Sequence, residues 1–120
     1  MGKTVIGFMT TAAEHFPYER PRELSAQAAR VLQGLEADLV VADRLVVDPT
    51  SAEAAAARFL EGKVDLVVSL CGSFTWDNMP VRVAQELRVP IVLWGLPEPP
   101  MAGGRLEANS LVGVTMNAAC

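Results

Sequence analysis

Short, nearly continuous apolar runs recur along the chain, and stretches with the 3.6-residue period of a helix lie between them. The apolar runs predict strands at about residues 4–9, 39–42, 64–70 and 91–94. The helical stretches predict helices at about 22–33, 50–62 and 79–87, and a last one that begins near residue 109 or 110. Buried strands that are each followed by a helix are typical of a parallel sheet covered on both faces.

Capping residues and apolar stripes refine the predicted helices. Gly34 is the expected left-handed residue after the first helix, and Thr50 and Glu53 have the spacing of a capping box at the start of the second. The predicted buried face of the first helix contains Leu24, Ala28, Val31, Leu32 and Leu35. That of the second contains Ala52, Ala55, Ala56, Phe59 and Leu60.

This order of elements predicts one α/β domain over residues 1–120, of the Rossmann-like (flavodoxin-like) three-layer class. We expect a parallel sheet of about four strands in the order 2-1-3-4, with helices on both faces. Ligands of such sheets bind at the carboxyl ends of the strands where the order reverses, here between the first and third strands. The last helix reaches Cys120 without a residue that ends helices, so we expect the N-terminal part of a longer protein.

Composition excludes several classes of protein. Hydrophobic residues make up 51% of the chain and charged residues 20%, as in globular domains. A net charge of −4 argues against nucleic-acid partners, and no apolar run reaches the roughly 18 residues of a membrane span. The N-terminus lacks the layout of a secretion signal, and the two cysteines, Cys71 and Cys120, form no disulfide framework. A cytoplasmic location is the simplest expectation.

Polar residues follow the predicted strands at the edge where a ligand is expected. They are Thr10, Thr11, His15 and Tyr18 after the first strand, Ser73, Thr75 and Trp76 after the third, and Glu98 after the fourth. The free N–H groups of a helix start near Ser73–Thr75 suit an anion or a sugar hydroxyl, and the ring of Trp76 suits sugar C–H groups. Alternatively, Ser73 and Thr75 satisfy the loop backbone and Trp76 packs on the sheet edge. The spacing of these residues favours neither the ligand-binding role nor the structural role.

Other chemistry finds little support in the sequence. His15 is the one histidine, and a lone histidine in a polar loop is more often solvated than catalytic. Cys71 follows a buried strand, which predicts an apolar filler and not a nucleophile. The chain lacks GxGxxG and Walker motifs and any grouping of carboxylates and histidines for a metal. We therefore assign no catalytic residue, cofactor or metal to it.

Three segments carry a family resemblance: Ser73-Phe74-Thr75, the run PIVLWGLPEP at 90–99 and the run GRLEANSLVG at 104–113. They resemble the N-terminal domain of the L-fucose isomerase and L-arabinose isomerase superfamily, and most closely its poorly characterised isomerase-like members. The resemblance covers most of the chain and is best from about Asp65 to Asn117. It implies a Rossmann-like domain whose strand-end loops help to form the active site of a neighbouring subunit in an oligomer.

The resemblance also implies where the chemistry lies. Family members interconvert aldoses and ketoses with a divalent metal, usually Mn²⁺, so we expect the metal ligands and the catalytic acid and base in later domains. The expected partners are a small-molecule sugar and other copies of the chain, without nucleic acid or membrane.

The leading hypothesis is the substrate-side and assembly domain of a sugar isomerase-like protein of carbohydrate metabolism, not catalytic alone. The alternatives are a stand-alone module that binds a sugar or small anion, and a purely structural oligomerisation domain.

Overall fold

The computed structural model describes residues 3–13, 18–73 and 79–96. The helices and strands in these ranges are β1 (Val5–Thr11), α1 (Glu19–Gln33), β2 (Asp38–Val41), α2 (Pro49–Glu61), β3 (Leu66–Cys71), α3 (Met79–Leu87) and β4 (Ile91–Trp94). They correspond to the predicted elements with shifts of a few residues at their ends. The last predicted helix, from residue 109 or 110, lies outside the described ranges.

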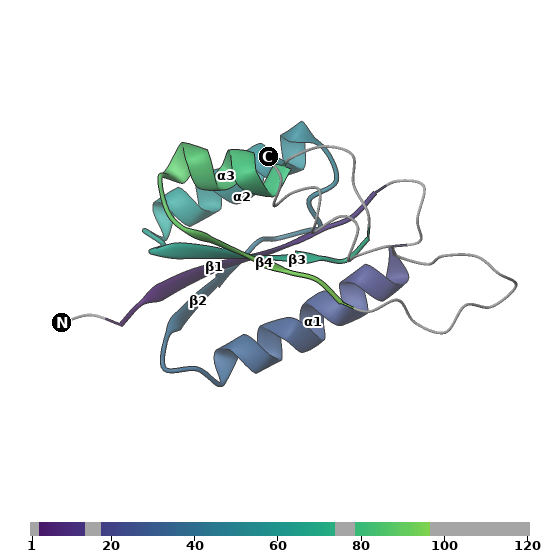
Figure 1. The fold of residues 1–120 in the computed structure, drawn as a ribbon, viewed down its shortest axis with the longest axis horizontal. Coiled ribbons are helices and arrows are strands. Elements are labelled where there is room, and N and C mark those ends of the chain that lie inside the picture. The colour runs from purple at the N-terminus through teal and green to yellow at the C-terminus, as the bar shows by residue number, and fades with distance from the viewer. Residues whose placement is uncertain (1–2, 14–17, 74–78, 97–120) are drawn as a thin grey trace, which may run out of the picture.

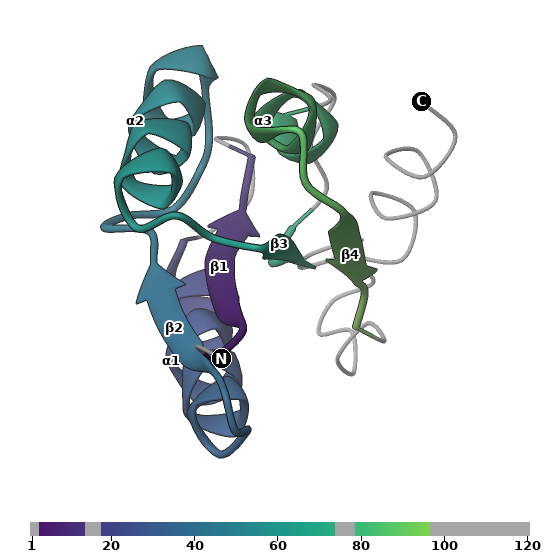
Figure 2. The same ribbon diagram turned by 90° about the vertical axis from the view of Figure 1, so that its left-hand side faces the viewer.

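The four strands pair in parallel in the order β2-β1-β3-β4, which confirms the predicted topology. β1 lies inside the sheet, with residues 5–8 opposite β2 and residues 6–11 opposite β3. α1 covers one face, and α2 and α3 cover the other (Figures 1 and 2). The structure is therefore a Rossmann-like (flavodoxin-like) three-layer α/β domain.

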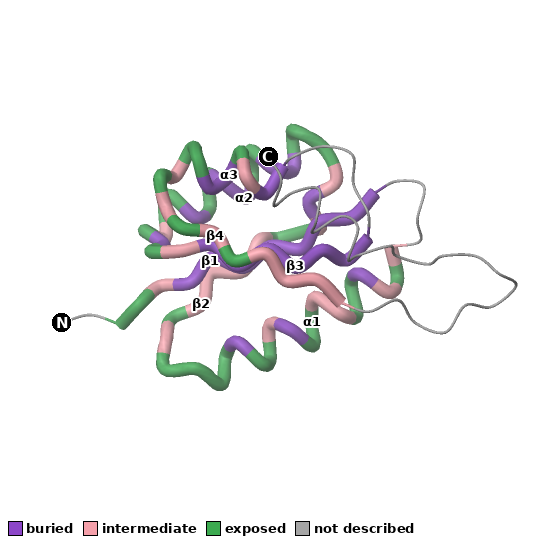
Figure 3. Tube along the Cα trace, viewed as in Figure 1, coloured by how far each residue is buried: buried purple, intermediate pink, exposed green. Residues whose placement is uncertain are grey.

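Two apolar clusters hold the layers together, one on each face of the sheet. Phe59 of α2 is fully buried on the α2–α3 side with Met9 and Val67, and Phe8 and Leu32 are buried on the α1 side. β1 and β3 accordingly form the buried middle of the molecule in Figure 3, while β2 and β4 are mostly half-buried. Burying such large side chains stabilises a fold by about 1.5–3 kcal/mol each.

Gly7 allows α2 to approach the sheet closely. A Cβ atom at position 7 would lie 3.0 Å from the ring of Phe59, closer than side chains normally pack. A glycine inside a strand usually marks such a close approach. The tight contact between β1 and the Phe59 ring therefore depends on the missing side chain at position 7.

We expect Gly7→Ala to lower the free energy of unfolding by about 1–3 kcal/mol, because the added methyl group overpacks a fixed, buried ring. Urea denaturation measures this. Gly34→Ala is the matched control, since Gly34 is exposed and already has a right-handed helical conformation (φ −74°). Equal losses in the two variants would contradict the proposed clash.

Some residues predicted to be buried are exposed. Val31 and Leu35 of the first predicted stripe are 64% and 53% exposed, and Leu60 of the second is 69% exposed. α1 instead contacts the sheet through Ala28 and Leu32. A helix on a sheet buries one stripe of its surface, and α1 is the one helix on its face among the described residues, so its flanks meet no second described helix.

The caps also differ from the prediction. Asp48 and not Thr50 caps α2: the Ser51 N–H donates to Asp48 Oδ1 (2.7 Å), and the Asp48 N–H donates to Ser51 Oγ (3.1 Å). Pro49 explains the earlier start, because a residue without an N–H fits the first helical position. Gly34 is not left-handed either; Lys63 (φ 54°) and Arg88 (φ 56°) take up that conformation.

The Asp48 cap predicts a pH-dependent stability. Hydrogen bonds from the N–H and hydroxyl of Ser51 lower the pKa of Asp48 from its ordinary value of 3.8. A carboxyl whose pKa is lowered by folding stabilises the fold above its unfolded pKa, and this contribution disappears as the pH falls through the folded pKa. Asp48→Ala should therefore lower the urea midpoint at neutral pH, and its difference from the parent chain should shrink below about pH 3.8.

Thr50→Ala is the control for this experiment. It should leave the midpoint unchanged or slightly raised at every pH, because alanine is the better helix former and Thr50 makes no capping hydrogen bond in the structure. A loss of stability in Thr50→Ala that matches Asp48→Ala would restore the cap predicted from the sequence.

Candidate functional site

β1 and β3 end side by side at the carboxyl edge of the sheet, with Thr11 opposite Cys71. The carbonyl oxygen of Thr11 accepts hydrogen bonds from the N–H groups of Gly72 (2.9 Å) and Ser73 (3.3 Å). The Ser73 hydroxyl oxygen accepts the N–H of Ala13 (2.9 Å). We call these residues, 11–13 and 72–73, the β1–β3 junction. Residues 14–17 and 74–78, which follow it, are therefore attached at neighbouring points.

Gly72 also connects the junction to α1. A Cβ atom at position 72 would lie 2.8 Å from Cβ of Pro21 and 3.0 Å from Cγ2 of Thr10. No side chain fits there, so the first turn of α1 packs directly on the end of β3. The starts of both loops and of α1 are thus fixed relative to one another.

Thr10 and Thr11 project to opposite faces of the sheet, as successive strand residues do. The hydroxyl of Thr10 donates to Oγ of Ser25 in α1 (2.8 Å), so Thr10 belongs to the α1 side. Thr11 is fully buried, and its hydroxyl oxygen has no hydrogen-bond partner in the described part of the chain. The two threonines therefore do not line one surface together.

The structure brings together two of the predicted site residues, Thr11 and Ser73, both fully buried. Tyr18 lies at the N-cap of α1, where its ring is 5.7 Å from the guanidinium carbon of Arg22, and it makes no side-chain cap. The other predicted site residues, His15, Thr75, Trp76 and Glu98, lie outside the described residues. Contact of any of them with a ligand stays a prediction.

The Ser73 hydroxyl satisfies a loop N–H, which is one of the two roles that spacing left open for it. Cys71 is buried, at 2% exposure, as expected of an apolar filler, and its thiol lies 3.3 Å from the Ser73 carbonyl oxygen. Trp94, the last residue of β4, and Leu96, just after it, pack against the apolar cluster on the α1 side. The first part of the Trp-Gly-Leu-Pro-Glu-Pro motif therefore contributes to the core.

A cavity of about 340 Å³ lies on the other side of β1, and the sequence analysis did not identify it. α1, the ends of β1 and β2, and residues 42–45 form its walls, and Arg22, Ser25 and Arg44 are among its polar residues. One signal was present in the sequence: Arg22, Ser25 and Ala29 share a helical stripe. The contribution of the β2 loop could not be read from spacing.

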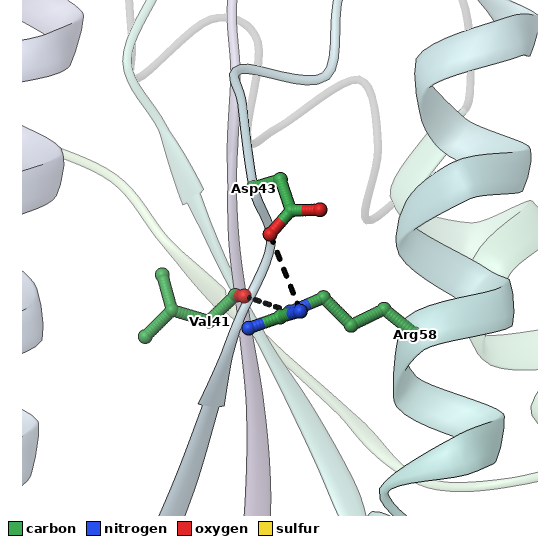
Figure 4. A network of polar contacts seen from close by, with 3 residues as sticks. All are labelled: Val41, Asp43 and Arg58. Atoms are coloured by element: carbon green, nitrogen blue, oxygen red, sulfur yellow. Dashed lines mark hydrogen bonds and ion pairs between the residues drawn. The ribbon is translucent and has the colours of Figure 1, made fainter.

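An ion pair connects the loop of residues 42–45 to α2. Arg58 of α2 donates through Nε to the carbonyl oxygen of Val41 (2.6 Å), and its Nη1 lies 3.2 Å from Oδ1 of Asp43 (Figure 4). Both side chains are substantially exposed, so the pair adds little stability by itself. The pair brings the Arg58 guanidinium close to the Asp43 carboxylate at the edge of this loop.

Metal-binding groups are not gathered in the described ranges, where no three His, Cys, Asp or Glu side chains could hold an ion together. The side chains of the described ranges thus do not fit a divalent metal site, and we derive no chemical step through one. None of the described helices is both long and apolar enough to cross a membrane.

The fold and the junction define the class, a Rossmann-like α/β domain with a hydrogen-bonded carboxyl edge. No protein-family profile, curated protein or solved structure gives a significant match to this chain. Its function therefore has to be argued from its own residues.

The junction predicts opposite effects of two substitutions. Ser73→Ala removes the acceptor of a buried N–H group and should lower the free energy of unfolding by about 1–3 kcal/mol. Thr11→Val keeps the shape and removes an unpartnered buried hydroxyl, so it should be neutral or stabilising. Chemical denaturation of the two variants measures both effects. A large loss in Thr11→Val would mean that the hydroxyl has a partner.

Proposed function

We propose that this chain is the substrate-side and assembly domain of a sugar (aldose–ketose) isomerase-like protein and that it is not catalytic alone. The observation that carries the proposal is the β1–β3 junction, from which two polar loops depart side by side at the edge where α/β sheets bind ligands. The resemblance of residues 65–117 to the N-terminal domain of the L-fucose and L-arabinose isomerase superfamily gives further support.

The available side chains suit binding better than proton transfer. Exchange between an aldose and a ketose moves a proton between adjacent carbons, which needs a positioned acid and base or a metal. Hydroxyl groups such as those of Thr75 and Tyr18 both donate to and accept from sugar hydroxyls. We therefore assign orientation of the sugar to this domain and place the proton transfer in other parts of the protein.

Within this proposal the loop after Ser73 makes the main contacts. Thr75 supplies a hydroxyl group, and the face of Trp76 packs on the C–H groups of the sugar. His15 and Tyr18 approach from the loop after β1, and Glu98 from the loop after β4. Other copies of the chain, in a homo-oligomer, supply the opposite wall of the site.

NMR titration of the ¹⁵N-labelled chain with pentoses and deoxyhexoses tests this function. We expect the amide signals of Ala13, Gly72 and Ser73 to shift, while those at the opposite edge of the sheet, such as Asp65 and Ile91, stay in place. Thr75→Val should weaken these shifts, and Thr50→Val in the first turn of α2 is the matched control. The chain with added Mn²⁺ should not convert any of the sugars.

Two results would overturn the proposal. One is robust aldose–ketose exchange by this chain alone, which would place the catalytic groups within it. The other is the absence of junction shifts with every sugar at saturating concentration.

A further inference from the structure

The cavity beside α1 differs chemically from the β1–β3 junction. Its floor is apolar, with Phe8, Val41 and Ala29, while its rim contains Arg22, Ser25 and Arg44. Known small-molecule sites combine an apolar lining with a few placed polar groups in this way, and they start at roughly 300 Å³. A volume of about 340 Å³ admits one compact molecule.

The outer wall of the cavity is fixed at both ends. The Ala42 N–H donates to the Phe8 carbonyl oxygen (2.9 Å), and the Val46 N–H donates to the Thr10 carbonyl oxygen (2.8 Å). Asp43, Arg44 and Leu45 therefore arch between two attachment points on β1. A wall that is already in place spares a ligand the entropic cost of ordering it.

Arg58 changes the charge that this wall presents. Its guanidinium pairs with Asp43, the carboxylate that lines the cavity, and its Nε–H bonds the Val41 carbonyl oxygen (Figure 4). Three guanidinium groups, those of Arg22, Arg44 and Arg58, and two carboxylates, those of Asp43 and Asp48, thus lie around the loop, in a chain whose net charge is −4. The charge around this loop is therefore positive, although the chain as a whole is acidic.

Arg22 and Arg44, the two arginines that line the cavity, have no ion-pair partner within the described ranges. Arg22 lies over the Tyr18 ring, 5.7 Å from its centroid, and Arg44 acts at longer range on Asp48, whose pKa it helps to lower. Guanidinium groups bind phosphate oxygens through charge-assisted, often bidentate hydrogen bonds. Their position on one cavity rim suits a phosphate group.

Ser25 adds a neutral donor. The Thr10 hydroxyl donates to Ser25 Oγ (2.8 Å), which leaves the Ser25 proton available to an acceptor in the cavity. The rim is therefore rich in donors, and its one carboxylate is already paired. An anion with several oxygen acceptors matches this arrangement.

We propose that this cavity binds a small phosphate monoester, with Arg22 and Arg44 holding the phosphate group, Ser25 donating to it, and the apolar floor receiving the organic part. The cavity accommodates one compact unit, such as a nucleoside monophosphate. This inference does not rest on the proposed sugar site, although Arg22 of the cavity lies over the ring of Tyr18, a predicted residue of that site.

Isothermal titration calorimetry and NMR with AMP as the probe, and adenosine and inorganic phosphate for comparison, test the proposal. AMP should bind more tightly than adenosine, shift the amide signals of Ser25 and Arg44, and bind more weakly as salt is added. Arg22→Gln and Arg44→Gln should each weaken binding by roughly tenfold or more. Arg30→Gln, which removes the same charge from α1 outside the cavity, should have no such effect.

The substituted arginines are exposed, so thermal melts of the variants should match the parent and show that they fold. The proposal is overturned if neither AMP nor phosphate binds at millimolar concentration, or if adenosine binds as tightly as AMP. It is also overturned if Arg30→Gln weakens binding as much as Arg22→Gln does. Because a nucleotide is not an aldose, these outcomes are independent of the sugar titration.

Discussion

The carboxyl end of β1 is the constraint on which the rest of the described structure depends. Within four residues, 10–13, its backbone bonds the β2 loop through Val46 on one side and the end of β3 through Gly72 and Ser73 on the other. The candidate sugar edge and the phosphate cavity are therefore built on the same short segment. A displacement of this segment would change both.

The alternation of side chains lets one strand serve two chemical environments. Thr10 turns toward α1 and takes part in the cavity, while Thr11 turns toward the layer of α2 and α3. Gly7 lies four residues before Thr11 and on the same face of the sheet. Because it has no side chain, the ring of Phe59 packs directly on β1 and brings α2 close to the sheet. The tight packing of Phe59 on β1 thus supports the polar end of the strand, since a binding site needs side chains held in place by a rigid, well-packed element.

The fold could be predicted because apolar runs and helical periods are local properties of the sequence. The sheet order then placed Thr11 beside Ser73 before any side-chain contact was known. Helix ends were harder, since Pro49 allows α2 to start at an Asp48–Ser51 cap that competes with the pattern at Thr50. The pairing of Arg58 with Asp43, and the cavity that Asp43 helps to line, depend on long-range packing that no spacing rule contains.

The burial of the junction separates two tasks that the sequence analysis had combined. Thr11 and Ser73 are fully buried, and the Ser73 hydroxyl is already bonded to the Ala13 N–H, so in the described structure they hold the backbone. A side chain that contacts a sugar has to reach solvent, so the proposed function assigns that contact to the predicted residues Thr75, Trp76, His15 and Tyr18. In this proposal the junction positions the backbone, and residues that follow it in the sequence recognise the ligand. This division explains why the polar residues at the strand ends need not be the ones that select the ligand.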